Sequence, residues 1–168
     1  LVRLRPRPLR VTCFVLDVHL GALARYLRLL GFDAFWRNDL DDATIVDVAA
    51  SEHRIVLTRD RGILKHGRVT HGYWLRATDP LAQLDEVVRA LDLGGGLAPY
   101  TRCIECNGEL EEVGRAEAAG RVPARVLAGH ERFRRCAGCG RFYWPGSHQP
   151  RLDAIVARAR AVAGAASG

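Results

Sequence analysis

Two hydrophobic patterns alternate along the first half of the chain. Short runs rich in β-branched and aromatic residues predict buried strands, and apolar residues at spacings of three and four predict helices. The four predicted strands are Cys13–Val18, Phe32–Trp36, Ile55–Asp60 and Tyr73–Arg76. Each is followed by a helical pattern, over His19–Gly31, Ala43–Glu52, Arg61–His66 and Pro80–Leu91. This alternation predicts an α/β fold, a three-layer α/β/α sandwich around a mainly parallel sheet whose strands all have their carboxyl ends at one edge.

Each predicted strand ends at or near an acidic residue. Asp17 and Asp60 lie at the ends of the first and third strands, Asp41 or Asp42 follows the second, and Asp79 follows the fourth. Ligands of open parallel sheets bind outside the carboxyl ends of the strands, so we expect these carboxylates to converge there. Mg²⁺ and Mn²⁺ prefer such oxygen ligands. Acids at helix starts are also ordinary caps, and at Asp79 capping competes with a catalytic role.

The basic residues nearest these acids are candidates for holding a nucleic-acid backbone. Gly21, Arg25 and Arg28 share one stripe of the first predicted helix, where a phosphate backbone could approach the glycine and meet both arginines. A solvated face with a tolerated glycine is the plainer interpretation. Arg59 and Lys65 are the other candidates, although Arg59 could instead brace its turn.

Paired cysteines mark the second half of the chain, beyond a glycine run at Gly94–Gly96 that we interpret as a linker. Two Cys-x-x-Cys pairs supply four thiolates, from Cys103, Cys106, Cys136 and Cys139. Four thiolates form a closed tetrahedral zinc site, whereas a redox dithiol is the alternative for either pair alone. The 29 residues between the pairs exceed the usual gap of a zinc ribbon, so we expect an inserted hairpin or loop. The fifth cysteine, Cys13, is expected to be a small core residue.

Aromatic residues follow the second cysteine pair directly, in Phe142–His148. Next to arginines they could stack on bases. Alternatively, they could form the small core of the zinc module or its seam with the main domain, which we favour for Trp144. His148 is a candidate phosphate contact, a further metal-ligand candidate or a surface residue. A final helix is predicted from Arg151 to about Val162.

The amino-acid composition gives the protein a net positive charge, which bears on the kind of partner it binds. The formal net charge is +6, and Lys65 is the only lysine among 25 basic residues. Because guanidinium groups bind phosphate in a bidentate manner, this charge suggests a polyanion partner, and a merely soluble surface of biased composition explains it equally well. No run is apolar enough to span a membrane and no signal peptide is visible. With paired cysteines, this indicates a reducing compartment, and we expect a cytoplasmic protein with no membrane partner.

Taken together, the motifs resemble a known family. Those that carry the resemblance are Phe14–Asp17, Leu20–Arg28, Gly31–Asp33, Leu57–Asp60, both cysteine pairs and Tyr143–His148. The chain is similar over roughly residues 13–152 to the Mut-seven C-terminal (Mut7-C) RNase domain, a branch of the PIN-like nucleases with an appended zinc ribbon.

The resemblance implies a PIN-like fold and metal-dependent cleavage of RNA. It implies catalytic roles for Asp17 and Asp60, which would also bind Mg²⁺ or Mn²⁺. Asp42 or Asp41 matches the middle acid, where PIN nucleases often have Glu, and Asp79 lies where a fourth acid is common. A structural Zn²⁺ would occupy the four cysteines. The expected substrates are tRNA, rRNA or single-stranded RNA, with the ribosome as a further partner.

The resemblance also suggests a division of the chain. We expect a basic arm over residues 1–12, a PIN-like nuclease domain over 13–98, a zinc ribbon over 99–150 and a helix with a tail over 151–168. Some family members carry a ubiquitin-like domain before the nuclease. Residues 1–12 are therefore interpreted either as a basic arm or as the remnant of such a preceding domain, and the absence of Met from the sequence fits the second alternative. The alternative function is a non-catalytic RNA- or ribosome-binding zinc-ribbon protein with a vestigial nuclease site; a toxin-type nuclease is a third.

Overall fold

A parallel sheet forms the centre of the first half of the protein. The computed structural model describes residues 11–166, so most of the predicted basic arm lies outside the described residues. The strands are β1 (Cys13–Leu16), β2 (Asp33–Phe35), β3 (Ile55–Thr58) and β4 (Gly72–Trp74). They pair in the order β2-β1-β3-β4, and every pairing is parallel. The predicted α/β class is therefore confirmed, with strands somewhat shorter than expected.

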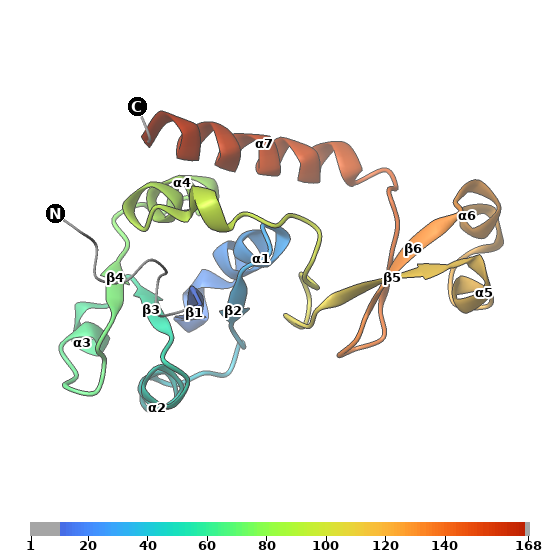
Figure 1. The fold of residues 1–168 in the computed structure, drawn as a ribbon. Coiled ribbons are helices and arrows are strands. Elements are labelled where there is room, and N and C mark those ends of the chain that lie inside the picture. Colours follow the sequence, from blue (N-terminus) through green and yellow to red (C-terminus); the bar gives the residue numbers. More distant parts are fainter. Residues whose placement is uncertain (1–10, 167–168) are drawn as a thin grey trace, which may run out of the picture.

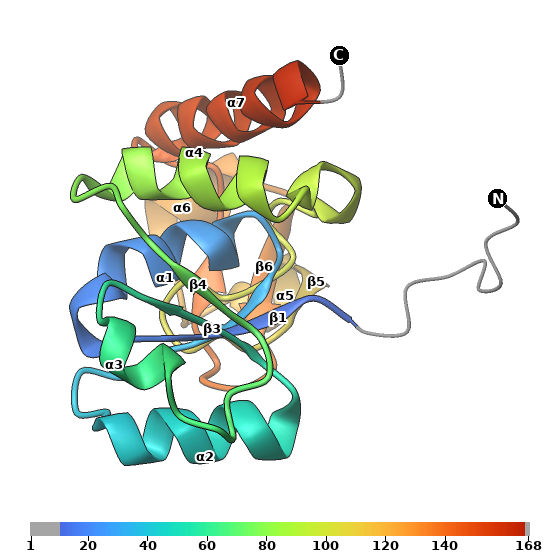
Figure 2. The same cartoon turned by 90° about the vertical axis from the view of Figure 1, so that its left-hand side faces the viewer.

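Helices cover both faces of this sheet (Figures 1 and 2). One face carries α1 (Gly21–Leu29) and α4 (Pro80–Ala90), and the other carries α2 (Asp42–Glu52) and α3 (Arg61–Leu64). A 3-10 turn, η1 (Val18–Leu20), joins β1 to α1. Successive strand side chains point to opposite faces, so Phe14 and Leu16 enter the core under α1 and α4 while Val15 enters the core over α2. The three predicted layers follow from this alternation.

A second, antiparallel sheet extends from the first unit (Figure 1). It contains β5 (Leu110–Gly114), β6 (Arg132–Cys136) and β7 (Phe142–Tyr143), in that order. The insertion expected between the cysteine pairs is the β5–β6 hairpin, which ends in two short helices, α5 (Arg115–Ala118) and α6 (Ala124–Gly129). A small core of Ala118, Val122 and Phe133 holds this tip, and Trp144 packs against it, as predicted.

The last helix returns from the second sheet to the first. α7 (Gln149–Ala166) lies along α4, starts earlier and ends later than predicted, and buries Ile155, Val156 and Ala159. Arg158 of α7 forms an ion pair with Asp85 of α4. The glycine run interpreted as a linker is instead part of a packed 3-10 turn, η2 (Leu93–Gly96), whose Leu93 is buried in the same core. None of the helices within residues 11–166 is long and apolar enough to cross a membrane.

Candidate functional site

The first candidate site lies where the parallel strands end, and we call Asp17, Asp41, Asp42, Asp60 and Asp79 the acidic edge. The strand order places these residues in the sequence Asp41/Asp42, Asp17, Asp60, Asp79 along the sheet. Asp17 and Asp60 therefore belong to the two central strands, which pair directly in parallel register.

A threonine connects the two central acids. The Thr58 hydroxyl donates a hydrogen bond to Oδ2 of Asp17 at 2.9 Å and accepts one from the backbone N–H of Asp60, also at 2.9 Å. Asp17 is only 9% exposed, and its Oδ1 accepts the backbone N–H of His19 at 3.4 Å. These bonds hold one carboxylate in a defined orientation at the rim of the sheet. Thr58 had no predicted role, although it belongs to the Thr-Arg-Asp motif.

Three of the other acids cap α-helices, as Asp17 caps the 3-10 turn η1. A carboxylate oxygen of Asp41 accepts the N–H of Thr44 at 2.8 Å, Asp60 that of Gly62 at 2.7 Å, and Asp79 that of Ala82 at 3.0 Å. The bonds from Thr44 lower the pKa of Asp41 below its ordinary value. The capping interpretation of Asp79 is thus confirmed, and the same role extends to Asp41 and Asp60. Asp42 lies exposed in the first turn of α2.

The carboxylates do not form a tight cluster. Within residues 11–166, the only group of three or more His, Cys, Asp or Glu residues close enough to hold a metal ion is that of the four cysteines. The convergence of all the predicted acids around one ion is therefore not present in this arrangement. Mg²⁺, however, commonly binds through one or two carboxylates and completes its shell with water and substrate phosphate. The donor set of Asp17 and Asp60 fits such a cation.

Basic and aromatic side chains border the acidic edge. Arg59 is exposed but donates to the carbonyl of Ala77 at 2.9 Å, so it braces its turn against the β4–α4 loop. The guanidinium of Arg61 lies 4.0 Å from the ring centroid of Trp74, a cation–π geometry that sequence patterns did not reveal. Lys65, at the end of α3, is exposed.

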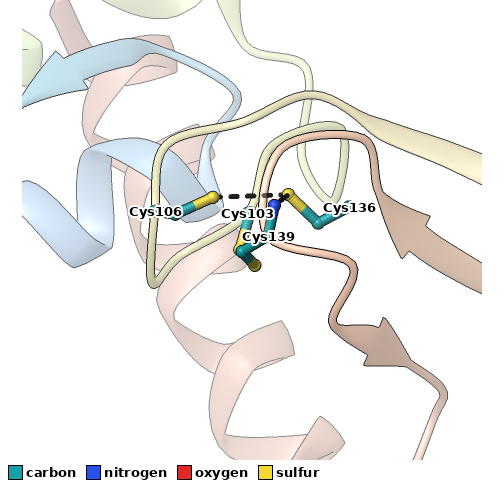
Figure 3. A group of neighbouring side chains, drawn as sticks. All are labelled: Cys103, Cys106, Cys136 and Cys139. Atoms are coloured by element: carbon teal, nitrogen blue, oxygen red, sulfur yellow. Dashed lines mark hydrogen bonds between the residues drawn. The ribbon is translucent and has the colours of Figure 1, made fainter. Parts of the chain in front are cut away.

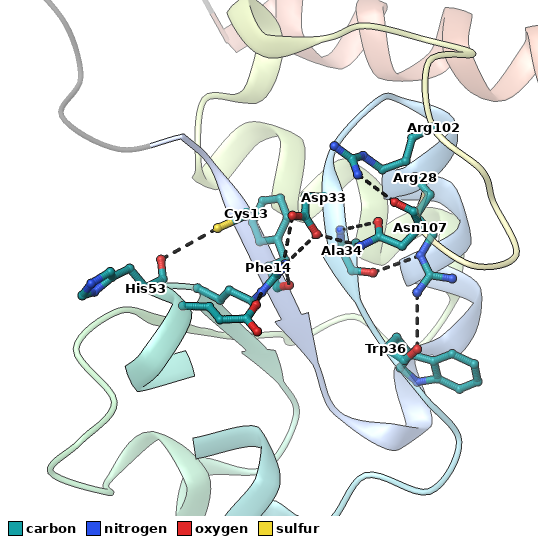
Figure 4. A network of polar contacts seen from close by, with 11 residues as sticks. Cys13, Phe14, Arg28, Asp33, Ala34, Trp36, His53, Arg102 and Asn107 are labelled. Atoms are coloured by element: carbon teal, nitrogen blue, oxygen red, sulfur yellow. Dashed lines mark hydrogen bonds and ion pairs between the residues drawn. The ribbon is translucent and has the colours of Figure 1, made fainter. Parts of the chain in front are cut away.

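Arg28 is placed differently from its prediction. The residue is 3% exposed, and its guanidinium donates to four backbone carbonyls, two of which, those of Ala34 and Trp36, are drawn in Figure 4. The acceptors belong to Ala34, Trp36, Ile104 and Glu105. A Cβ on Gly21 would meet the Trp36 ring at 2.7 Å. The prediction of an exposed stripe is therefore wrong for Gly21 and Arg28. The Trp36 ring covers Gly21, and the first cysteine pair with the residues between its cysteines covers Arg28. Arg25 alone is exposed, and it pairs with Glu105 at 2.7 Å.

The second candidate site is the cysteine cluster (Figure 3). The Sγ atoms of Cys106 and Cys136 lie 3.3 Å apart, and those of Cys103 and Cys139 lie 3.9 Å apart. Burial raises the pKa of Cys106 to about 12. At Cys136 burial acts in the same direction, but hydrogen bonds from the Cys139 N–H and the Cys106 thiol outweigh it and lower the pKa to about 7. One thiolate is thus favoured before a cation binds, and a bound divalent metal would deprotonate the others.

Neighbours of the cysteines shape this site and were not predicted. The hydroxyl of Tyr143 lies 2.9 Å from the Sγ of Cys103. A Cβ on Gly108 would lie 2.8 Å from the Sγ of Cys136, so only glycine fits beneath the thiols. Asn107 adopts a φ of 72° and donates to Asp33 at 2.7 Å, which ties the knuckle to β2 (Figure 4). The adjacent pair Asn107-Gly108 was the available signal, since it marks a tight turn. The four thiols lie close enough to hold one zinc ion.

Comparison with protein families gives one match. The model described as "Mut7-C RNAse domain" matches residues 12–156, nearly the whole chain. No match was found among the curated proteins or among the solved structures.

Proposed function

Because the chain belongs to the Mut7-C RNAse domain family, we propose that it is a metal-dependent ribonuclease, which hydrolyses RNA phosphodiester bonds at the acidic edge. The observation that carries this proposal is the connection of Asp17 to Asp60 through Thr58 at the carboxyl ends of two adjacent strands. This is the edge at which open parallel sheets bind their ligands.

Asp17 and Asp60 would hold Mg²⁺ or Mn²⁺ between them. The bound ion would lower the pKa of a water molecule and neutralise charge on the phosphoryl oxygens. Thr58 orients the Asp17 carboxylate, and the bond to Gly62 orients that of Asp60. Asp42 or Asp41 on one side and Asp79 on the other would position water or the RNA strand. The exposed Arg61, which follows Asp60, and the exposed Lys65, at the other end of α3, would contact phosphates.

The experiment that tests the proposal is cleavage of labelled single-stranded RNA, tRNA and rRNA with and without added Mg²⁺ or Mn²⁺. Asp60→Asn is expected to lower the rate by about a hundredfold, equivalent to about 2.7 kcal/mol of barrier. Asn is as good a helix cap as Asp, so α3 should remain intact. Asp92→Asn is the matched control, because Asp92 is exposed, lies outside the acidic edge and has a φ of 50° that Asn tolerates. Metal-dependent cleavage that is unchanged in Asp60→Asn would rule out this site.

The rival function is a non-catalytic RNA- or ribosome-binding protein. It is favoured by the capping bonds of Asp41, Asp60 and Asp79, which give these acids a structural role without any metal. Under the rival, the parent protein binds RNA but releases no metal-dependent product. For either function we propose a cytoplasmic location, where paired cysteines remain reduced and available to zinc.

A further inference from the structure

A groove lies between the α/β unit and the tip of the second sheet, and no residue of the acidic edge lines it. Its volume is about 880 Å³, within the range of about 300–1,000 Å³ typical of ligand-binding clefts. One wall comes from α1, the opposite wall from α6, and the N-terminal end of α7 closes it (Figure 1). We call this the α1–α6–α7 groove, and its chemically distinctive residues are Arg25, Tyr26, Arg125, Trp144, His148 and Arg151.

The charge of the groove has one sign. Among the described residues that line it, three are arginines, two are histidines and none is an aspartate or glutamate. Glu105 partly neutralises Arg25, whereas Arg125 and Arg151 are exposed on two different helices. The first turn of α7 contains no acidic residue, and Asp153 of the next turn, which accepts a hydrogen bond from Gln149, does not line the groove. The field in the groove therefore favours an extended polyanion.

Aromatic surface accompanies this charge. Tyr26, Tyr143 and Trp144 all line the groove. Trp144 is half-buried, because part of it packs against the core of the hairpin tip while part of it faces the groove. A rigid aromatic ring next to arginines is the arrangement on which single-stranded nucleic acids stack their bases. An acidic protein segment would use the charges but has no need of the ring.

We propose that the α1–α6–α7 groove binds a single-stranded segment of RNA, with phosphates on Arg125 and Arg151 and a base on Trp144. The inference rests on the proposed function, since it assigns the same substrate a second contact surface. α1 connects the two sites: its N-terminus follows Asp17 by way of η1, and its last residue, Leu29, lines the groove. At about 1.5 Å of rise per residue, the helix spans roughly 12 Å. The groove would hold RNA to one side of the bond being cut.

The test is fluorescence anisotropy of a 5′-fluorescein-labelled decauridine on the zinc-loaded full chain without added Mg²⁺. Arg125→Glu with Arg151→Glu is expected to raise Kd by about tenfold or more, because two phosphate contacts become repulsive. The matched control is Arg89→Glu with Arg160→Glu, because both arginines are exposed and lie outside the groove. This control variant has the same net charge as the variant with both groove arginines replaced. Equal Kd values for the two double variants would overturn the proposal.

Trp144 gives an independent measurement. Trp144→Phe keeps an aromatic ring and is expected to change Kd by less than about threefold, whereas Trp144→Leu, which keeps apolar packing, should raise it about fivefold or more. Equal affinities of the two variants would contradict base stacking. A labelled decaglutamate that binds as tightly as decauridine, with the same loss in the arginine double variant, would identify an acidic peptide instead of RNA and overturn the proposal.

Failure of the groove and failure of the nuclease site give different results. If Asp60→Asn cleaves like the parent while the arginine double variant loses binding, the groove stands and the proposed active site falls. If Asp60→Asn is inactive while the arginine double variant binds and cleaves like its control, the nuclease site stands and the groove falls. Zinc content and thermal unfolding of each variant, compared with the parent, establish that the fold is intact.

Discussion

The cysteine cluster and the acidic edge both contain residues that bind metals, but the protein assembles them differently. The four thiols lie within 4.8 Å of one another, packed around Gly108 in a single small module. The carboxylates come from the ends of separate strands, and three of them are engaged in capping helices. Thiols can pack together while neutral, whereas ionised carboxylates repel each other unless a cation lies between them. Four thiols can therefore be brought together by the fold alone, whereas carboxylates can come equally close only when a cation offsets their repulsion.

Removing zinc ligands tests the first half of this comparison and should have the largest effect. Structural zinc sites contribute about 10–16 kcal/mol of apparent binding free energy. Cys136→Ser with Cys139→Ser is expected to abolish zinc binding and to unfold the second sheet, measured by metal content and circular dichroism. Cys13→Ser is the control, since Cys13 lies in β1 outside the cluster. A double variant that retains zinc would show that the cluster is not its ligand set.

The contact between the two regions is the next target. Arg28→Met removes a buried guanidinium and leaves four carbonyls without their donor, which should lower the free energy of unfolding by about 3 kcal/mol or more. Arg25→Met, one turn earlier on α1, breaks only an exposed ion pair and should cost less than about 1 kcal/mol. Urea denaturation measures both. Equal losses would mean that Arg28 does not join the two units energetically.

The outer acids test the second half of the comparison. Asp79→Asn keeps the cap of α4, so thermal stability should not change. If Asp79 positions water or RNA and does not bind the metal itself, the cleavage rate of Asp79→Asn should fall by about tenfold, or roughly 1.4 kcal/mol of barrier. This loss is smaller than the one expected for Asp60→Asn. Parallel measurements of rate and melting temperature separate the two roles. A loss as large as that of Asp60→Asn would place Asp79 among the direct ligands.

The smallest predicted effect is a pH dependence of the free energy of unfolding that arises from Asp33 of β2, which accepts a hydrogen bond from Asn107 of the cysteine module. Burial alone would raise the pKa of Asp33, but hydrogen bonds from Arg54 and Asn107 outweigh it and hold that pKa below its ordinary value of 3.8. A depressed pKa gives stability that is present above about pH 4 and is lost as the pH falls toward the folded-state value. The free energy of unfolding should therefore fall less steeply in Asp33→Asn than in the parent as the pH is lowered from about 5 to 3. Identical slopes for parent and variant would contradict this.

The regular elements could be predicted because their causes are local. Strand and helix periodicity located all four parallel strands, and two Cys-x-x-Cys pairs indicated the cluster. The burial of Arg28 could not be predicted, because the carbonyls of Ile104 and Glu105 that cover it lie 76 and 77 residues away in sequence. The groove was equally hidden, since its arginines come from three separate helices. Helix capping could be predicted for individual acids from their positions at predicted helix starts. The bond from Thr58 to Asp17 could not, because it depends on the register between β1 and β3.

The return of α7 to α4 has a consequence for how the protein can be divided. The chain leaves the α/β unit after η2, forms the cysteine module and then comes back along α4, where Ile155, Val156 and Ala159 of α7 join the core of the α/β unit. Truncation before Cys103 would therefore remove a layer from the α/β unit as well as the cysteine module, and would leave an apolar face uncovered. The two halves are interleaved along the polypeptide, so that neither can be obtained intact by a single cut.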